Sequence, residues 1–79
     1  MDEHASTPKT LKRVRTARLL TVRGLAAAAG VSTHTVHEVE TGKRPPRFAT
    51  IKRLSAALEV DPSEVAEFRA VIFGQEQKR

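Results

Sequence analysis

The 79-residue chain contains no cysteine, no tryptophan and no tyrosine. The absence of cysteine excludes disulfide bonds, thiol nucleophiles and thiolate metal ligands. Long apolar runs are also absent, because the longest, residues 25–29, is far shorter than the roughly 20 residues that a membrane-spanning helix needs. The acidic N-terminus lacks the basic and apolar regions of a secretory signal. We therefore expect a cytoplasmic protein without a membrane partner, stabilised by packing alone.

The length of the chain predicts one domain over residues 1–79, because two hydrophobic cores of half this size rarely fold unaided. Its ordered core is expected at about residues 8–73, with flexible segments at 1–7 and 74–79. Signals for catalysis are weak. His34, His37 and Glu38 do not match the metalloprotease helix patterns, a glycine-rich phosphate loop is missing, and no hydroxyl lies beside a convincing base. The sequence thus predicts no enzyme, no bound metal and no cofactor.

Positive charge is concentrated in the middle of the chain. Residues 9–53 hold eleven Lys or Arg against two acidic residues, whereas residues 54–79 hold three basic and five acidic residues. Such a distribution presents one basic face, which is typical of a protein that binds a polyanion. An ordinary solvated surface would have a similar composition, so the motifs must decide between the two interpretations.

Helix start and stop signals predict three short helices in the first part of the chain. The first is expected to begin near residues 7–8, a Thr-Pro pair, and to end within residues 18–20. The second spans residues 22–29 between a capping Thr21 and Gly30. The third spans residues 33–41 between Ser32 and Gly42. The diproline loop at residues 43–47 cannot continue this helix.

Two further helices are predicted after this loop. The fourth has an apolar stripe at helical spacing, formed by Phe48, Ile51, Leu54 and Leu58. The fifth is expected to start at Asp61, with Pro62 in the first turn and Glu64 completing a capping box. Its stripe consists of Val65, Phe68 and Ile72. Because no run of alternating β-branched residues competes as a strand, the predicted fold class is all-α with five helices.

The second and third predicted helices have the layout of a helix-turn-helix, in which the second helix of the pair enters the major groove of DNA. The residues that show it are LAAAAGVS at 25–32, Val36 and ETGKR at 40–44. This pattern resembles the λ-repressor and Cro type of helix-turn-helix domain, the XRE family. The resemblance covers residues 11–65 and implies a compact five-helix domain that binds double-stranded DNA and regulates transcription.

The same resemblance implies a structural salt bridge between Arg15 in the first helix and Glu40 late in the third. A buried pair of this kind would hold the recognition helix in place. Three positions depart from the family pattern. Gly24 lacks the acid or Gln of a capping box, and Leu19 and Glu59 stand where turn glycines are common, so the geometry of those turns is left open.

Candidate DNA contacts lie at the start and on the outer face of the third helix and at the ends of its neighbours. We expect base reading from the exposed side chains Thr33, His34, Thr35 and Glu38. Glu38 either accepts a hydrogen bond from a base or only repels the wrong sequence. Phosphate contacts are expected at two helix N-termini and in the diproline loop, from Thr21, Val22, Arg23, Ser32, Lys43, Arg44 and Arg47.

Association with another protein is the alternative to DNA binding, because helical domains of this kind also serve as adaptors or as antitoxins. The fifth predicted helix carries more apolar surface than one inward stripe requires, because Val71 and Phe73 stand beside Ile72 of the stripe. Three roles are open for these residues at this point: packing on the core, binding a protein partner, or forming a homodimer. A two-fold dimer would place two recognition helices on half-sites about one DNA turn apart and favour a near-palindromic operator.

Overall fold

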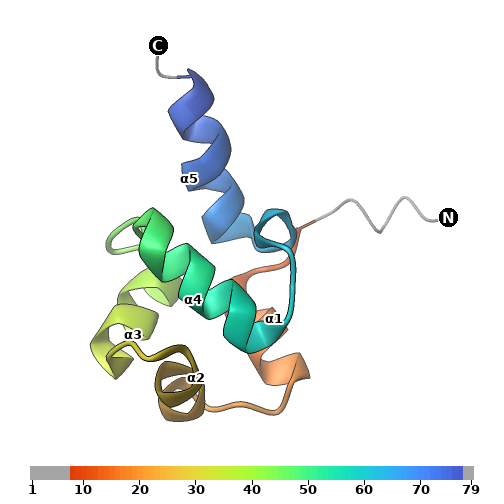
Figure 1. Ribbon diagram of the computed structural model, residues 1–79, viewed down its shortest axis with the longest axis vertical. Helices are drawn as coiled ribbons and strands as arrows, with labels where there is room; N and C mark the ends of the chain where they lie inside the picture. The colour runs from red at the N-terminus through yellow and green to blue at the C-terminus, as the bar shows by residue number, and fades with distance from the viewer. Residues whose placement is uncertain (1–7, 78–79) are drawn as a thin grey trace, which may run out of the picture.

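The computed structural model describes residues 8–77, with side chains described through residue 74. The described residues form five α-helices and one 3-10 turn: α1 (Leu11–Ala17), α2 (Val22–Ala29), α3 (Thr33–Thr41), α4 (Phe48–Leu58), η2 (Pro62–Glu64) and α5 (Ala66–Gln77). Within this part of the chain the only extended pairing is an isolated parallel bridge between Lys9 and Val65. The predicted all-α class is confirmed. Figure 1 shows α5 projecting from a body formed by α1 to α4.

Both α2 and α3 begin and end at the residues that the sequence predicts. The Thr21 hydroxyl accepts a hydrogen bond from the Gly24 amide at 2.9 Å, and the Ser32 hydroxyl accepts one from the Thr35 amide at 3.0 Å. Each helix ends on a glycine with positive φ, 72° at the first and 74° at the second. These local caps satisfy backbone groups that a helix end would otherwise leave unpaired.

The start of α1 differs from the prediction. The helix begins at Leu11 and is capped by the Thr10 hydroxyl, three residues after the predicted start; Thr7 itself lies outside the described residues. The reason is a contact distant in sequence: Lys9 is paired in extended conformation with the start of α5. Its amide donates to the Glu64 carbonyl at 3.1 Å, and its carbonyl accepts from the Ala66 amide at 2.8 Å.

The start of α5 also differs from the prediction. The capping box of Asp61 and Glu64 is present, but it caps the 3-10 turn η2. Hydrogen bonds from the Ser63 hydroxyl and amide hold the pKa of Asp61 below its ordinary value. Val65 is extended, because it forms the bridge to Lys9, so α5 starts at Ala66. This helix continues beyond residue 73 as far as Gln77.

The core lies between all five helices. Its buried apolar residues are Leu11, Val14, Leu25, Ala26, Ala29, Val36, Val39, Ile51, Leu54, Leu58, Val65 and Phe68. The predicted stripe of α4 is confirmed except for Phe48, which is 54% exposed. Phe48 is the first residue of the helix, and the buried residue at this end is Pro46 instead. On α5, Ile72 packs against this core but is only half-buried.

Candidate nucleic-acid interface

The turn between α2 and α3 fixes the angle between the two helices. The Val31 amide donates to the Ala26 carbonyl at 3.0 Å, while Gly30 adopts the left-handed conformation that allows the chain to reverse. Val36 and Val39 are buried, so the inner face of α3 packs on the core. The opposite face of α3 is left at the surface of the domain (Figure 1).

Arg15 and Glu40 clamp α3 from its inner side. The Arg15 Nε donates to Glu40 Oε2 at 2.6 Å, and a second guanidinium nitrogen donates to Oε1 at 3.2 Å. The third nitrogen donates to the Leu20 carbonyl at 2.9 Å. Both side chains are 9% exposed. This bidentate pair joins α1, the α1–α2 turn and the last turn of α3, so it restricts rotation of α3 about its own axis.

At the start of α3, the predicted base-reading residues differ in exposure. Thr33 is exposed, and the His34 side chain is 77% exposed. Thr35 is half-buried, and its hydroxyl lies 2.9 Å from the Ser32 hydroxyl within the N-terminal cap. Thr33 and His34 are therefore accessible to another molecule, although His34 Nε2 lies 3.1 Å from a Glu38 carboxylate oxygen. The Thr35 hydroxyl, in contrast, is engaged within the cap.

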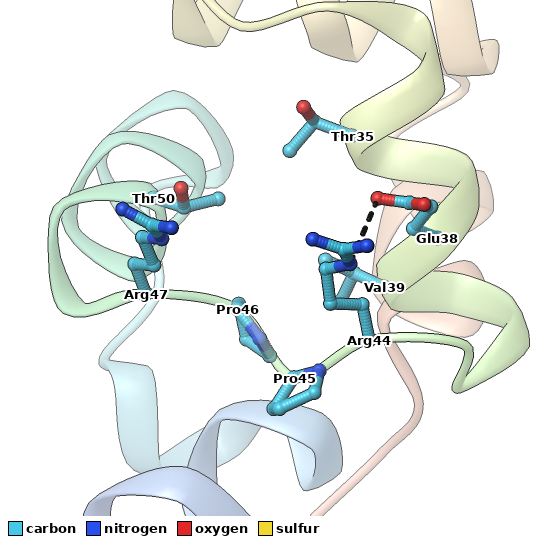
Figure 2. Close-up of a pocket in the computed structure, with 8 residues that line it drawn as sticks. All are labelled: Thr35, Glu38, Val39, Arg44, Pro45, Pro46, Arg47 and Thr50. Carbon is cyan, nitrogen blue, oxygen red and sulfur yellow. Dashed lines mark ion pairs between the residues drawn. The ribbon is translucent and has the colours of Figure 1, made fainter.

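Glu38 is not the exposed side chain that the sequence predicts. Its side chain is only 19% exposed and lies between two nitrogen-bearing groups. His34 Nε2 is 3.1 Å from one carboxylate oxygen, and Arg44 Nε is 3.8 Å from the other. Figure 2 shows the Arg44 side chain reaching across from the diproline loop to Glu38. The loop contact was not predicted, because nothing in the spacing of residues 38 and 44 indicates that the loop folds back onto α3.

The two arginines of the loop face a shallow hollow between α3 and the start of α4 (Figure 2). Its lining consists of Thr35, Glu38, Val39, Arg44, Pro45, Pro46, Arg47 and Thr50. The volume of about 190 Å³ is below the range of roughly 300–1,000 Å³ that is usual for small-molecule sites. Within the described part of the chain, no side chain caps the N-terminus of α4 behind this hollow.

The predicted phosphate-binding residues fall into three short segments. Thr21 and Arg23 are exposed at the start of α2, where Val22 is half-buried. Ser32 is exposed at the start of α3. Lys43, Arg44 and Arg47 are all exposed in the loop after α3. The hollow brings together Arg44 and Arg47, but among the described residues no hydrogen bond or ion pair links them to the other two segments.

Sequence reasoning missed two residues near these segments. Thr50 lines the hollow from the first turn of α4, and it was missed because the hollow itself depends on the path of the diproline loop. Arg53 donates to the Gly30 carbonyl at 3.3 Å, so it helps to satisfy the C-terminal end of α2. The basic character of Arg53 was visible in the sequence, but its partner was not.

Two short helices joined by a tight turn, the second of them buried on one side and polar on the other, form a helix-turn-helix. Here α2 and α3 have this arrangement, and a basic loop follows α3. The family model described as a helix-turn-helix domain matches residues 9–68, and the chain belongs to this family. None of the helices within residues 8–77 has the length and hydrophobicity that crossing a membrane requires. Among the side chains that the structure describes, residues 8–74, no three His, Asp or Glu are grouped as metal ligands would be.

Two curated relatives come from Bacillus subtilis (strain 168). The uncharacterized HTH-type transcriptional regulator RghRB is 49% identical over 51 residues, which cover 63% of this chain and 37% of the relative. The HTH-type transcriptional repressor RghR is 43% identical over 61 residues, covering 76% of this chain and 44% of the relative. The chain therefore spans less than half the length of either relative. No solved structure matches it at a significant level.

Proposed function

We propose that this chain binds double-stranded DNA in a sequence-specific manner and regulates transcription in the cytoplasm, with α3 as the helix that enters the major groove. The observation that carries the proposal is the arrangement of α3, whose inner face is fixed by the Arg15–Glu40 pair while its outer face is polar and exposed. The similarity to two HTH-type transcriptional regulators supports the same function.

Base reading in this proposal is assigned first to Thr33 and His34. Both are exposed at the N-terminal end of α3, which is the end that meets base edges in helix-turn-helix proteins. A threonine contacts a thymine methyl or a base edge, and a histidine donates to a guanine acceptor. Thr35 and Glu38 are proposed as secondary readers, because each is half-buried rather than exposed.

Backbone contacts are assigned to the three basic or amide-bearing segments around α3. The starts of α2 and α3 present amides and the hydroxyls of Thr21 and Ser32, while Arg23 adds positive charge. Lys43, Arg44 and Arg47 neutralise phosphates from the loop. Within the described structure no acidic residue stands in the first turn of α2, α3 or α4, so these helix ends favour an anion.

A homodimer through α5 is the second part of the proposal. Val71 and Ile72 pack against the core but are only half-buried, Phe73 is 39% exposed, and the helix projects from the body of the domain (Figure 1). The Arg69 guanidinium lies 4.8 Å from the centre of the Phe73 ring, so one face of that ring is already covered. A two-fold pairing of α5 would bury the remaining apolar surface and double the DNA contacts.

Selection of bound duplexes from a random DNA pool tests the proposal. We expect enrichment of one motif, with two related half-sites if α5 forms the dimer. Light scattering on the wild type and on Phe73→Lys measures the oligomeric state independently of DNA. Failure to enrich any sequence, together with retention of a protein partner, would instead establish an adaptor or antitoxin, which is the alternative function.

A further inference from the structure

Two ion pairs hold α3, and they differ in strength. Arg15–Glu40 is almost completely buried and bidentate, with a shortest contact of 2.6 Å. Glu38–Arg44 has one contact of 3.8 Å, and the Arg44 side chain is 72% exposed. Solvated pairs with a single long contact contribute little free energy. The first pair is therefore a fixed part of the fold, whereas the second can open at small cost.

We propose that Glu38 and Arg44 form an exchange pair, in which Glu38 neutralises Arg44 in the free protein and releases it to a DNA phosphate only when a base offers Glu38 another hydrogen-bond donor. This inference rests on the proposed function and assigns a regulatory role within that interface. Glu38 thereby determines specificity in part by controlling whether Arg44, on the loop after α3, binds a DNA phosphate.

The position of the carboxylate supports this coupling. Glu38 lies one turn after His34 on the α3 surface and lines the same hollow as Arg44 and Arg47 (Figure 2). If Arg44 leaves for a phosphate, the 19%-exposed carboxylate keeps His34 as a neighbour but loses its guanidinium partner near a negatively charged backbone. An unpaired, partly desolvated charge beside phosphates is unfavourable.

Base chemistry supplies the condition for release. Cytosine and adenine each present an amino group in the major groove, and a carboxylate accepts a hydrogen bond from such a group. Every base pair carries one such amino group, so the condition is its position: where none lies within reach of Glu38, Glu38 keeps Arg44 and the complex lacks one phosphate contact. On the correct duplex, both contacts form together. Specificity then arises from a penalty on the wrong sequence as well as from a gain on the right one.

Salt titrations of DNA affinity with single and double variants test the exchange. The logarithm of the binding constant falls linearly with log salt, and each phosphate contact adds about 0.9 to the magnitude of this negative slope. On a duplex of mixed sequence, we expect Glu38→Gln to steepen the slope by about 0.9 and to tighten binding by about twofold to fivefold, because Arg44 is freed. The affinity ratio between the selected duplex and the mixed duplex should fall.

Arg47 provides the matched control, because it lines the same hollow and forms no ion pair with any described side chain. On the mixed duplex, Arg47→Gln as a single substitution should reduce the magnitude of the slope by about 0.9, while Arg44→Gln alone should hardly change it. In the Glu38→Gln background, Arg44→Gln should reduce the magnitude of the slope by about 0.9. Glu59→Gln removes the same charge at the opposite end of α4 and should leave the slope unchanged.

The outcomes separate the two proposals. If the wild type binds DNA but Arg44→Gln and Arg47→Gln reduce the magnitude of the slope equally on the mixed duplex, Arg44 is already free and the exchange pair is refuted. An unchanged slope or affinity ratio in Glu38→Gln refutes it as well. If instead the wild type shows no measurable, salt-dependent affinity for DNA, the proposed function fails, and the exchange pair fails with it.

Discussion

The helix-turn-helix half of the molecule and the seam between α1 and α5 are stabilised in different ways. The ends of α2 and α3 are set by caps from residues within three positions, such as the Ser32 hydroxyl and Gly42. The seam is set by contacts across more than fifty residues, including the Lys9–Val65 bridge and the bond from the Leu11 amide to Glu67. Local caps make the recognition unit regular, whereas distant contacts decide where the flanking helices begin.

The largest effect should come from the contact that joins these two regions. Arg15→Ala leaves the Glu40 carboxylate buried without its partner, and we expect a loss of about 3–5 kcal/mol in the free energy of unfolding. Urea denaturation measures this loss. Arg44→Ala is the control, since its exposed pair should contribute less than about 1 kcal/mol. A loss below about 1 kcal/mol for Arg15→Ala would show that the first pair behaves like a surface pair.

The seam should be weakened next by Glu67→Ala. Glu67 Oε1 accepts from the Leu11 amide at 2.8 Å and so caps α1 from α5. Removal of this charged acceptor should cost about 1–2 kcal/mol. Hydrogen exchange of the Leu11 amide should accelerate more than that of the α3 amides. Glu67→Gln keeps an acceptor and should lose less; equal losses in the two variants would contradict a hydrogen-bonding role.

The local cap of α3 is expected to contribute slightly less. Ser32→Ala removes the acceptor for the Thr35 amide and should cost about 1 kcal/mol. Ser32→Asp keeps a capping oxygen and serves as the control. Exchange of the first-turn amides of α3 should rise while the α1–α5 seam stays protected. Loosening of the seam to the same degree would mean that the two regions are not independently stabilised.

The smallest change tests the turn that leads from the seam into the helix-turn-helix. Leu19 has φ 60° and is 92% exposed, so its side chain gains little from packing while its backbone is strained. Leu19→Gly should raise the free energy of unfolding by about 0.5–1 kcal/mol. Leu19→Ala keeps the strain and should give no comparable gain. A thermal unfolding series is sufficient to detect the difference.

The sequence predicted helix ends correctly where they depend on residues within one turn, and wrongly where they depend on residues distant in the chain. Caps and closing glycines predicted both ends of α2 and α3, because those signals act within one turn. The predicted start of α1 and the predicted start of α5 were wrong for one shared reason, the pairing of Lys9 with Val65. At the candidate interface, the exposure of Glu38 was overestimated, because its contact with Arg44 depends on the path of the diproline loop.

The two turns without glycine show the limits of pattern matching in another way. Leu19 and Glu59 occupy positions where glycine is common, and both adopt positive φ, 60° and 59°. The chain keeps the geometry of these turns despite the unfavourable residues. Arg18 bridges them, with a guanidinium nitrogen 3.5 Å from Glu59 Oε1. Backbone hydrogen bonds close both turns, from the Leu20 amide to the Arg15 carbonyl at 3.2 Å and from the Val60 amide to the Ser55 carbonyl at 3.1 Å. The helix ends therefore hold a backbone conformation that the residues themselves disfavour.

The amino-acid sequence by itself determined the all-α class, the helix-turn-helix core, the basic character of the central segment and the two residues that clamp α3. Each of these depends on periodicity, short-range capping, charge or a family pattern. Tertiary structure alone decided where α1 and α5 begin, that Phe48 is exposed, and that Arg44 rests on Glu38. The helix starts depend on a pairing between residues distant in the chain, and the other two features depend on the path of the diproline loop, which is set only once the core has packed.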